Sequence, residues 1–176
     1  MKDVAGLVPG AYKGRGKGNR FLADLCDADV LVHVLDVTGQ ADADGNIVTP
    51  SHHSAIHSSE LLSSSQPSSL PLFAGSGPSE DAKWIREELH RWIHANIRAK
   101  WAMVSRKGAD RALDQLAALL SGYHGNKSLI ESAVQRSKLN VAESSNWSLF
   151  DTHRLVAHYL SIRFPICLAL NKVNIY

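Results

Sequence analysis

The run "DVLVHVLDV" at residues 29–37 is the stretch on which the predicted fold depends. It is almost continuously apolar and rich in β-branched residues, a pattern typical of a strand buried on both faces of a parallel sheet. A second run of this kind, "ICLALNK", occupies residues 166–172. Two parallel strands need a crossover connection, and the one between these runs is unusually long. We therefore predict an α/β fold, a doubly wound parallel sheet with a large α-helical insertion.

The connection itself has two parts of different composition. Residues 40–79 are rich in Ser, His, Pro and Gly and poor in core-forming side chains, so a disordered loop is expected there. Residues 80–164 carry apolar positions at helical spacing, beginning with a helix of roughly 25 residues capped by Ser79 or Asp81. Shorter amphipathic helices are predicted to follow it in "ADRALDQLAALLSGY" (109–123), "KSLIESAVQRSKL" (127–139) and "SLFDTHRLVAHYLSIRF" (148–164).

The overall composition narrows the class of protein only loosely. Of the 176 residues, 44% are hydrophobic and 20% charged, and the formal net charge is +2. Such values are ordinary for a globular protein and say little about partners. Two cysteines in separate apolar segments make neither a disulfide framework nor a metal site, which favours a reducing compartment. Neither a signal peptide nor a membrane-spanning run is recognised, so we expect a cytoplasmic protein without a membrane partner.

A glycine-rich loop, "DVAGLVPGAYKGRGKGNRF", occupies residues 3–21 and leads into the first strand. Ligands of doubly wound folds bind beyond the carboxyl ends of the strands. At such a position Asp3 can hold the water shell of Mg²⁺, and Gly6 lets its backbone N–H approach a terminal phosphate. By itself D-x-x-G is a weak signal, because many glycine-rich turns without any such role contain it.

The end of the second strand carries a second candidate site. Asn171, Lys172 and Asn174 form the sequence N-K-V-N, which begins like the purine-base motif N-K-x-D of GTPases. In that motif the Lys packs over the base and the Asp accepts two hydrogen bonds from guanine. Because Asn174 stands in place of the Asp, the motif is incomplete.

Residues 3–39, "DVAGLVPGAYKGRGKGNRFLADLCDADVLVHVLDVTG", resemble the switch II region and next strand of the Obg/YchF-type GTPases. Those proteins carry D-[VI]-[AP]-G-L-[VI]-x-G-A-x-x-G-x-G-L-G-x-x-F-L, followed by A-D-x-L-x-H-V-[VIL]-D. Lys17 departs from the pattern, since the family usually has Leu there. The remainder of the chain is similar to the archaeal and fungal YchF-related subgroup, in its long helix and in "NWSLFDTHRLVAHYL" before the base-binding strand.

The resemblance implies a P-loop NTPase fold and the binding and hydrolysis of a purine triphosphate with Mg²⁺. GTP is the expected ligand, with ATP as the alternative, and the ribosome or its RNA is the implied partner rather than DNA. A basic cluster of Lys13, Arg15, Lys17 and Arg20 could contact phosphate or ribosomal RNA, or could be a solvated loop. Leu7 replaces the Gln that orients water in Ras-like proteins, so no catalytic residue is assigned.

The P-loop sequence G-x-x-x-x-G-K-[ST] does not occur in the chain, and "GRGKGN" fails its spacing. We therefore expect part of a G domain, unable to bind nucleotide alone. Its expected divisions are a switch II loop, helix and strand (1–39), the disordered loop (40–79), the helical insertion (80–164) and the base-binding strand (165–176). The alternative is a non-catalytic interaction protein that uses the helical insertion as its binding surface.

His90 and His94 lie one helical turn apart, a spacing that occurs in zinc sites. The sequence "HRWIH" lacks the Glu of a zinc protease helix, and no third ligand is evident. We therefore interpret both as residues at the boundary of the apolar face of the helix. His33, inside the first apolar run, is interpreted as a core or sheet-face residue.

Overall fold

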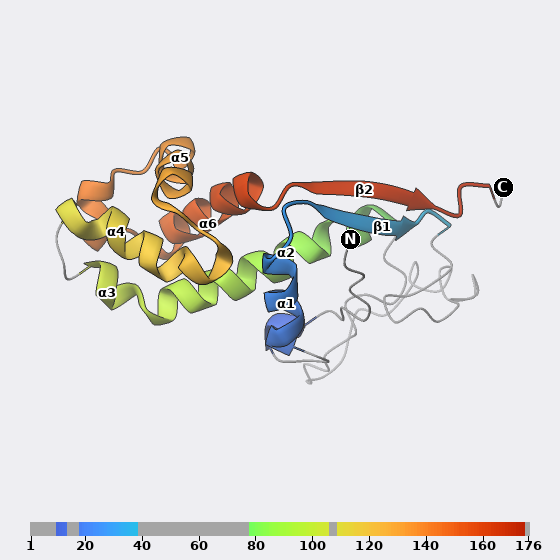
Figure 1. Cartoon of the computed structure of the whole chain (residues 1–176), viewed down its shortest axis with the longest axis horizontal. Helices are drawn as coiled ribbons and strands as arrows, with labels where there is room; N and C mark the ends of the chain where they lie inside the picture. The colour runs from blue at the N-terminus through green and yellow to red at the C-terminus, as the bar shows by residue number, and fades with distance from the viewer. Residues whose placement is uncertain (1–9, 14–17, 39–77, 106–108, 175–176) are drawn as a thin grey trace, which may run out of the picture.

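The computed structural model describes residues 10–13, 18–38, 78–105 and 109–174. Helices gather at one end of the molecule, and a two-stranded sheet extends from them at the other (Figure 1). The strands are β1 (Leu31–Asp36) and β2 (Ile166–Asn171). The helices are α1 (Gly18–Cys26), α2 (Pro78–Ala99), α3 (Trp101–Ser105), α4 (Ala109–Leu120), α5 (Lys127–Ser137) and α6 (Leu149–Arg163). Short 3₁₀ turns are η1 (Ala11–Lys13), η3 (Ser121–Tyr123) and η4 (Val141–Asn146).

The two strands pair in parallel, as their sequences predict. Their register runs from Leu31 opposite Ile166 to Asp36 opposite Asn171. The connection between them contains α2 to α6, which we call the helical block. The mixed α/β fold with a large helical insertion is therefore confirmed. The predicted disordered loop falls almost wholly outside the described residues, and α2 begins at Pro78.

The prediction that both strands are buried on both faces is wrong for this chain. Leu31, His33 and Leu35 of β1 are buried, whereas Val32 and Val34 on its other face are 61% and 60% exposed. Helix α2 packs on the first face, where the Trp84 ring meets the His33 ring edge-on with centroids 6.3 Å apart. No described element covers the second face, and β2 is largely exposed. The interpretation of His33 as a core residue is confirmed.

The long helix predicted after residue 79 is interrupted. Helix α2 ends at Ala99, and α3 begins at Trp101. At the break, the amides of Lys100 and Met103 donate to carbonyls three residues earlier, at Ile97 and Lys100. Such tighter bonds change the direction of the chain. The new direction allows the Trp101 ring to stack on the Trp147 ring, with centroids 5.7 Å apart, and both side chains are buried.

The three amphipathic helices that follow are confirmed, and two begin at identifiable caps. The side chain of Asn126 accepts a hydrogen bond from the Leu129 amide at the start of α5. Ser148 and Asp151 form a reciprocal capping box at the start of α6. These caps satisfy amides that have no partner within the helix. The sequence of each helix therefore specifies its own starting point.

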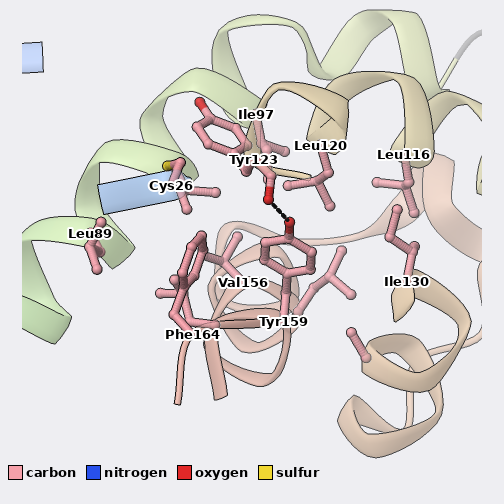
Figure 2. Close-up of a cluster of buried hydrophobic side chains, with 14 of the residues drawn as sticks. Cys26, Leu89, Ile97, Leu116, Leu120, Tyr123, Ile130, Val156, Tyr159 and Phe164 are labelled. Atoms are coloured by element: carbon pink, nitrogen blue, oxygen red, sulfur yellow. Dashed lines mark hydrogen bonds between the residues drawn. The ribbon is translucent and has the colours of Figure 1, made fainter. Parts of the chain in front are cut away.

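The main hydrophobic core lies inside the helical block, where helices α4, α5 and α6 face one another (Figure 2). Its central side chains have relative exposures between 0% and 1%: Leu116, Leu120, Ile130, Val156 and Tyr159. The hydroxyl of Tyr159 donates a hydrogen bond of 2.9 Å to the carbonyl oxygen of Tyr123, drawn as a dashed line in Figure 2. A buried hydroxyl needs such a partner, so this bond allows the ring to stay in the core.

Arg163, at the end of α6, connects the helical block to α1. Its guanidinium donates to the carbonyl oxygens of Cys26 (2.8 Å), Ala28 (2.9 Å) and Tyr123 (3.2 Å). Carbonyls at the end of a helix lack partners within it. One side chain thus satisfies the end of α1 and fixes the start of β1 relative to β2. None of the described helices is long and apolar enough to cross a membrane.

Candidate functional site

The carboxyl ends of β1 and β2 lie side by side, at the edge where this class of sheet binds its ligands. Asp36 is opposite Asn171 in the register, and the Val37 amide donates to the Asn171 carbonyl at 3.3 Å. Five polar residues end the two strands, and we call them the strand-end cluster: Asp36, Thr38, Asn171, Lys172 and Asn174. The parallel pairing therefore brings together residues that are about 135 positions apart in the sequence.

Lys172 turns back toward β1 immediately after β2 ends. Its φ is 61°, a left-handed conformation that is uncommon for a residue other than Gly, Asn or Asp. The side chain of Asn171 accepts a hydrogen bond of 2.9 Å from the Lys172 amide and so supports this turn. The Lys172 ammonium reaches Oδ2 of Asp36 at 2.7 Å. The turn thus directs a lysine across the ends of both strands.

Asp36 is held from its other side by Thr38. Its Oδ1 accepts hydrogen bonds from the Thr38 amide (3.0 Å) and the Thr38 hydroxyl (2.7 Å). The hydrogen bond from Lys172, followed by those from Thr38, lowers the pKa of Asp36 to about 2. The carboxylate is therefore ionised at neutral pH, and it provides a fixed acceptor for the lysine.

The structure brings together only some of the residues predicted from the sequence. Asn171, Lys172 and Asn174 lie at the end of β2 as expected, with Asn171 and Asn174 exposed and Lys172 half-buried. Asp3 and Gly6 lie outside the described residues, so their predicted roles are untested. Asp36 was not predicted to be a site residue, although it ends the "DVLVHVLD" run. An acidic residue directly after a buried-strand pattern was the signal that could have identified it.

In the sequence, the first described residues after Asp3 and Gly6 are those of the turn from Gly10 to Lys13. The carboxylate of Glu88, on α2, accepts hydrogen bonds from the amides of Gly10 (2.9 Å) and Tyr12 (3.0 Å). Gly10 has a φ of 90°, which side chains with a Cβ rarely adopt. This turn is therefore attached to the helical block rather than to the sheet.

The histidines of α2 make a second polar cluster, together with His153 of α6. The rings of His94 and His153 stack with centroids 3.4 Å apart, and the His90 ring lies 5.1 Å from that of His153. His90 Nε2 donates to the His153 carbonyl at 3.1 Å, since a carbonyl only accepts. The Thr152 hydroxyl gives its hydrogen to the Leu149 carbonyl, so it accepts at 3.0 Å from His94 Nε2.

This histidine cluster is not arranged as a metal site. Both Nε2 atoms donate in these bonds, so each neutral ring keeps its lone pair on Nδ1. Among the described residues, no group of three or more His, Cys, Asp or Glu side chains could hold a metal ion. Burial, together with the nearby charges of His153, His90 and Arg98, lowers the pKa of His94 to about 4. Its ring is therefore neutral at physiological pH and part of the α2–α6 contact.

The known proteins similar to this chain are described as GTP-binding proteins or as a ribosome-binding ATPase. No protein-family model matches the chain. An uncharacterized GTP-binding protein of Schizosaccharomyces pombe is 33% identical over 99% of this chain, which spans 37% of that relative's length. A ribosome-binding ATPase, YchF, of Buchnera aphidicola is 54% identical over 35 residues, 20% of this chain and 10% of that protein. The crystal structure of a GTP-binding protein from Pyrococcus horikoshii superposes with a TM-score of 0.59, at 22% identity, covering 84% of this chain and 36% of that one.

Proposed function

The chain belongs to the Obg/YchF-type GTP-binding proteins, and from that premise we propose that it contributes to a purine nucleotide site with the strand-end cluster on its base side. The observation that carries the proposal is the contact of 2.7 Å between Lys172 and Asp36 across the ends of two parallel strands. It holds the lysine of an N-K-x-D-like sequence at the ligand-binding edge of the sheet.

The base would be recognised by Lys172 and Asn174. With its ammonium bound to Asp36, Lys172 can offer its methylene groups as a flat apolar support for a purine ring. Guanine presents two donors, N1–H and the N2 amine, whereas an Asn amide offers one acceptor and one donor. One guanine donor would then face a donor of Asn174, and an unmatched polar pair in a site lowers affinity. Asn174 therefore weakens the discrimination of guanine from adenine.

The phosphate side of the proposed site rests on Asp3 and Gly6, from the sequence alone. Asp3 would hold Mg²⁺ through water, and the bound ion would neutralise phosphate charge. Gly6 would direct its amide to the terminal phosphate. Leu7 has no hydrogen-bonding group and cannot orient a water molecule, so we assign no catalytic residue. GTP hydrolysis is proposed from the resemblance alone.

The ribosome is the proposed macromolecular partner. Support comes from the relative named a ribosome-binding ATPase, which matches only a short part of this chain. Lys13 and Arg20, both exposed, are the described members of the basic cluster that could contact RNA phosphates. The sequence has only two cysteines, in separate apolar segments, which supports a cytoplasmic location. We do not favour the interaction-protein alternative, because Trp101 and Trp147 belong to the core.

Calorimetric titration with GTP and ATP tests the proposal. We expect no measurable binding at micromolar ligand by the 176-residue chain, because most phosphate affinity in this fold comes from the P-loop and its helix. A chain to which a P-loop segment is added before residue 1 and the rest of a G domain after residue 176 should bind GTP. In that extended chain, Asn174→Asp should increase the preference for GTP over ATP. Micromolar affinity of the 176-residue chain, or failure of the extended chain to bind, would contradict the proposal.

A further inference from the structure

Glu88 is buried, and both oxygens of its carboxylate accept hydrogen bonds. Its residue is 5% exposed, and it lies on α2 in the middle of the contact with the Gly10–Lys13 turn. Oε1 accepts from the Gly10 amide at 2.9 Å and Oε2 from the Tyr12 amide at 3.0 Å. A buried carboxylate is costly unless hydrogen bonds compensate for the lost water. The two amides provide that compensation, so the carboxylate and the turn depend on each other.

The Gly10–Lys13 turn also packs against α1 and makes further contacts with α2. Its internal bond runs from the Lys13 amide to the Gly10 carbonyl at 2.9 Å. Ala11 is buried, at 1% exposure, and the Arg91 guanidinium of α2 lies 5.6 Å from the centre of the Tyr12 ring. The contacts from α2 therefore fix both the backbone and one ring of the turn. They come from an element more than 75 residues away in the sequence.

Helix α2 is in turn firmly joined to the rest of the helical block. Its histidines bond to α6 through the His153 carbonyl and the Thr152 hydroxyl. The side chains of Leu89 and Ile93, on the same helix as Glu88, are 1% and 0% exposed. The Gly10–Lys13 turn is thus bound to a well-packed body. It begins only four residues after Gly6, the glycine expected to approach the terminal phosphate.

We propose that Glu88 is a positioning residue for the terminal-phosphate side of the nucleotide site, acting through the Gly10–Lys13 turn. This positioning role rests on the proposed function, because it assumes that Asp3 and Gly6 contact the phosphates. Glu88 holds the turn that begins four residues after Gly6 in the sequence. The helical insertion then has a role in the site itself, since it carries the residue that holds this turn.

Hydrogen exchange on the 176-residue chain tests the anchor without any nucleotide. We expect Glu88→Gln to accelerate exchange of the Gly10 or Tyr12 amide by about tenfold or more, because the amide side chain accepts at one atom only. Glu87→Gln is the matched control, since Glu87 is exposed and pairs only with Arg91 at 3.1 Å among the contacts described. Amides of α6 should exchange equally in both variants.

Two results in this experiment would overturn the anchor. One is equal exchange of the Gly10 and Tyr12 amides in the two variants. The other is acceleration spread evenly over α2 and α6, which would show that Glu88 merely stabilises the whole fold. If Glu88→Gln does not fold, Glu88→Asp retains the charge and withdraws the carboxylate by one methylene. Glu87→Asp is then its control, and the same two results would overturn the anchor.

The link to the phosphate is tested in the extended chain that includes the P-loop. Glu88→Gln should weaken GTP binding by about tenfold and leave GDP binding within about twofold, because GDP lacks the terminal phosphate. Glu87→Gln should change neither. An equal loss for both nucleotides would overturn the positioning role. If the unaltered extended chain binds no GTP, the proposed function fails and this role fails with it, whereas the exchange experiment still decides whether Glu88 anchors the turn.

Discussion

The helical block and the two-stranded sheet bury their apolar side chains to very different extents. Leu116 and Tyr159 of the block are 0% exposed, whereas Val34 of β1 and Leu170 of β2 are each 60% exposed. Both regions have strongly apolar sequences, so composition does not explain the difference. The block closes on itself, because its helices surround a common core. The strands have sequences suited to a sheet covered on both faces, and the described residues cover only one face of β1.

This difference indicates that the two regions owe their stability to different sources. The block has the caps, the core and the buried hydrogen bonds that a folded unit needs. The strands are held to each other and to α2, with Arg163 fixing their entry points. The chain spans 37% of the length of its fission-yeast relative, and we expect the exposed strand faces to be covered in a protein of that length.

The same substitution in each region gives the largest expected contrast. Leu116→Ala should lower the free energy of unfolding by about 3 kcal/mol, because it leaves a cavity in the core. Leu170→Ala should change it by less than about 0.5 kcal/mol, since that side chain is mostly in solvent. Chemical denaturation of the two variants measures both values. Equal losses would show that the sheet is as well packed as the block.

As the pH falls, the helical block should lose stabilisation at a higher pH than the strand ends do. The pKa of His94 is about 4 in the folded chain, below its ordinary value of 6.5, so the stabilisation from the neutral ring is complete above 6.5. It is lost as the pH falls from 6.5 through 4, by on the order of 3 kcal/mol. His90 and Arg98 on α2 and His153 on α6 all disfavour the protonated ring.

The corresponding group at the strand ends responds at lower pH. The pKa of Asp36 is about 2, below its ordinary 3.8, so its contribution is complete above 3.8 and is lost only as the pH falls toward 2. Denaturation curves between pH 7 and 4 should therefore depend on His94 and not on Asp36. His94→Gln, which keeps a donor for Thr152, should flatten the pH dependence in this range, and Asp36→Asn should not. The reverse result would refute the assignment.

Self-association of the chain should depend on the exposed strands, and its expected change in free energy is smaller than those in the preceding predictions. The edge of a strand that has no partner strand favours edge-to-edge pairing of chains. Val34→Lys should raise the dissociation constant of the self-associated chain by about tenfold, equivalent to about 1.4 kcal/mol. Met103→Lys, at 50% exposure on α3, is the control and should have little effect. Sedimentation at several concentrations measures this. A chain that stays monomeric at every concentration would contradict the expectation.

The sequence predicted the elements well and their surroundings poorly. The apolar runs at residues 29–37 and 166–172 and the helical periodicity are local signals, and the structure confirms the strands and helices that they predicted. Exposure of the strand faces depends on what packs against them, which a local pattern does not contain. The break at Lys100 accompanies the contact of Trp101 with Trp147, which joins residues distant in the sequence and so is likewise absent from a local pattern.

In the candidate site, too, the residues of a local motif were predictable and their distant partners were not. Asn171, Lys172 and Asn174 were identifiable because three neighbouring residues carry the motif. The partner of Lys172 was not, since Asp36 is distant in sequence and only the parallel register brings the two together. Glu88 was missed for the same reason, because nothing in "REELHRW" distinguishes it from the exposed Glu87 before it.

Native-state hydrogen exchange across the whole chain tests the central claim, that the helical block is the stable unit and the sheet is not. Amides of α4 and α6 should exchange only through global unfolding, whereas those of β1 and β2 should exchange at least about tenfold faster through local opening. The difference should be largest without denaturant and should narrow toward the main transition, because denaturant accelerates global unfolding and hardly affects local opening. Protection of β1 and β2 equal to that of α4 and α6 would contradict the account.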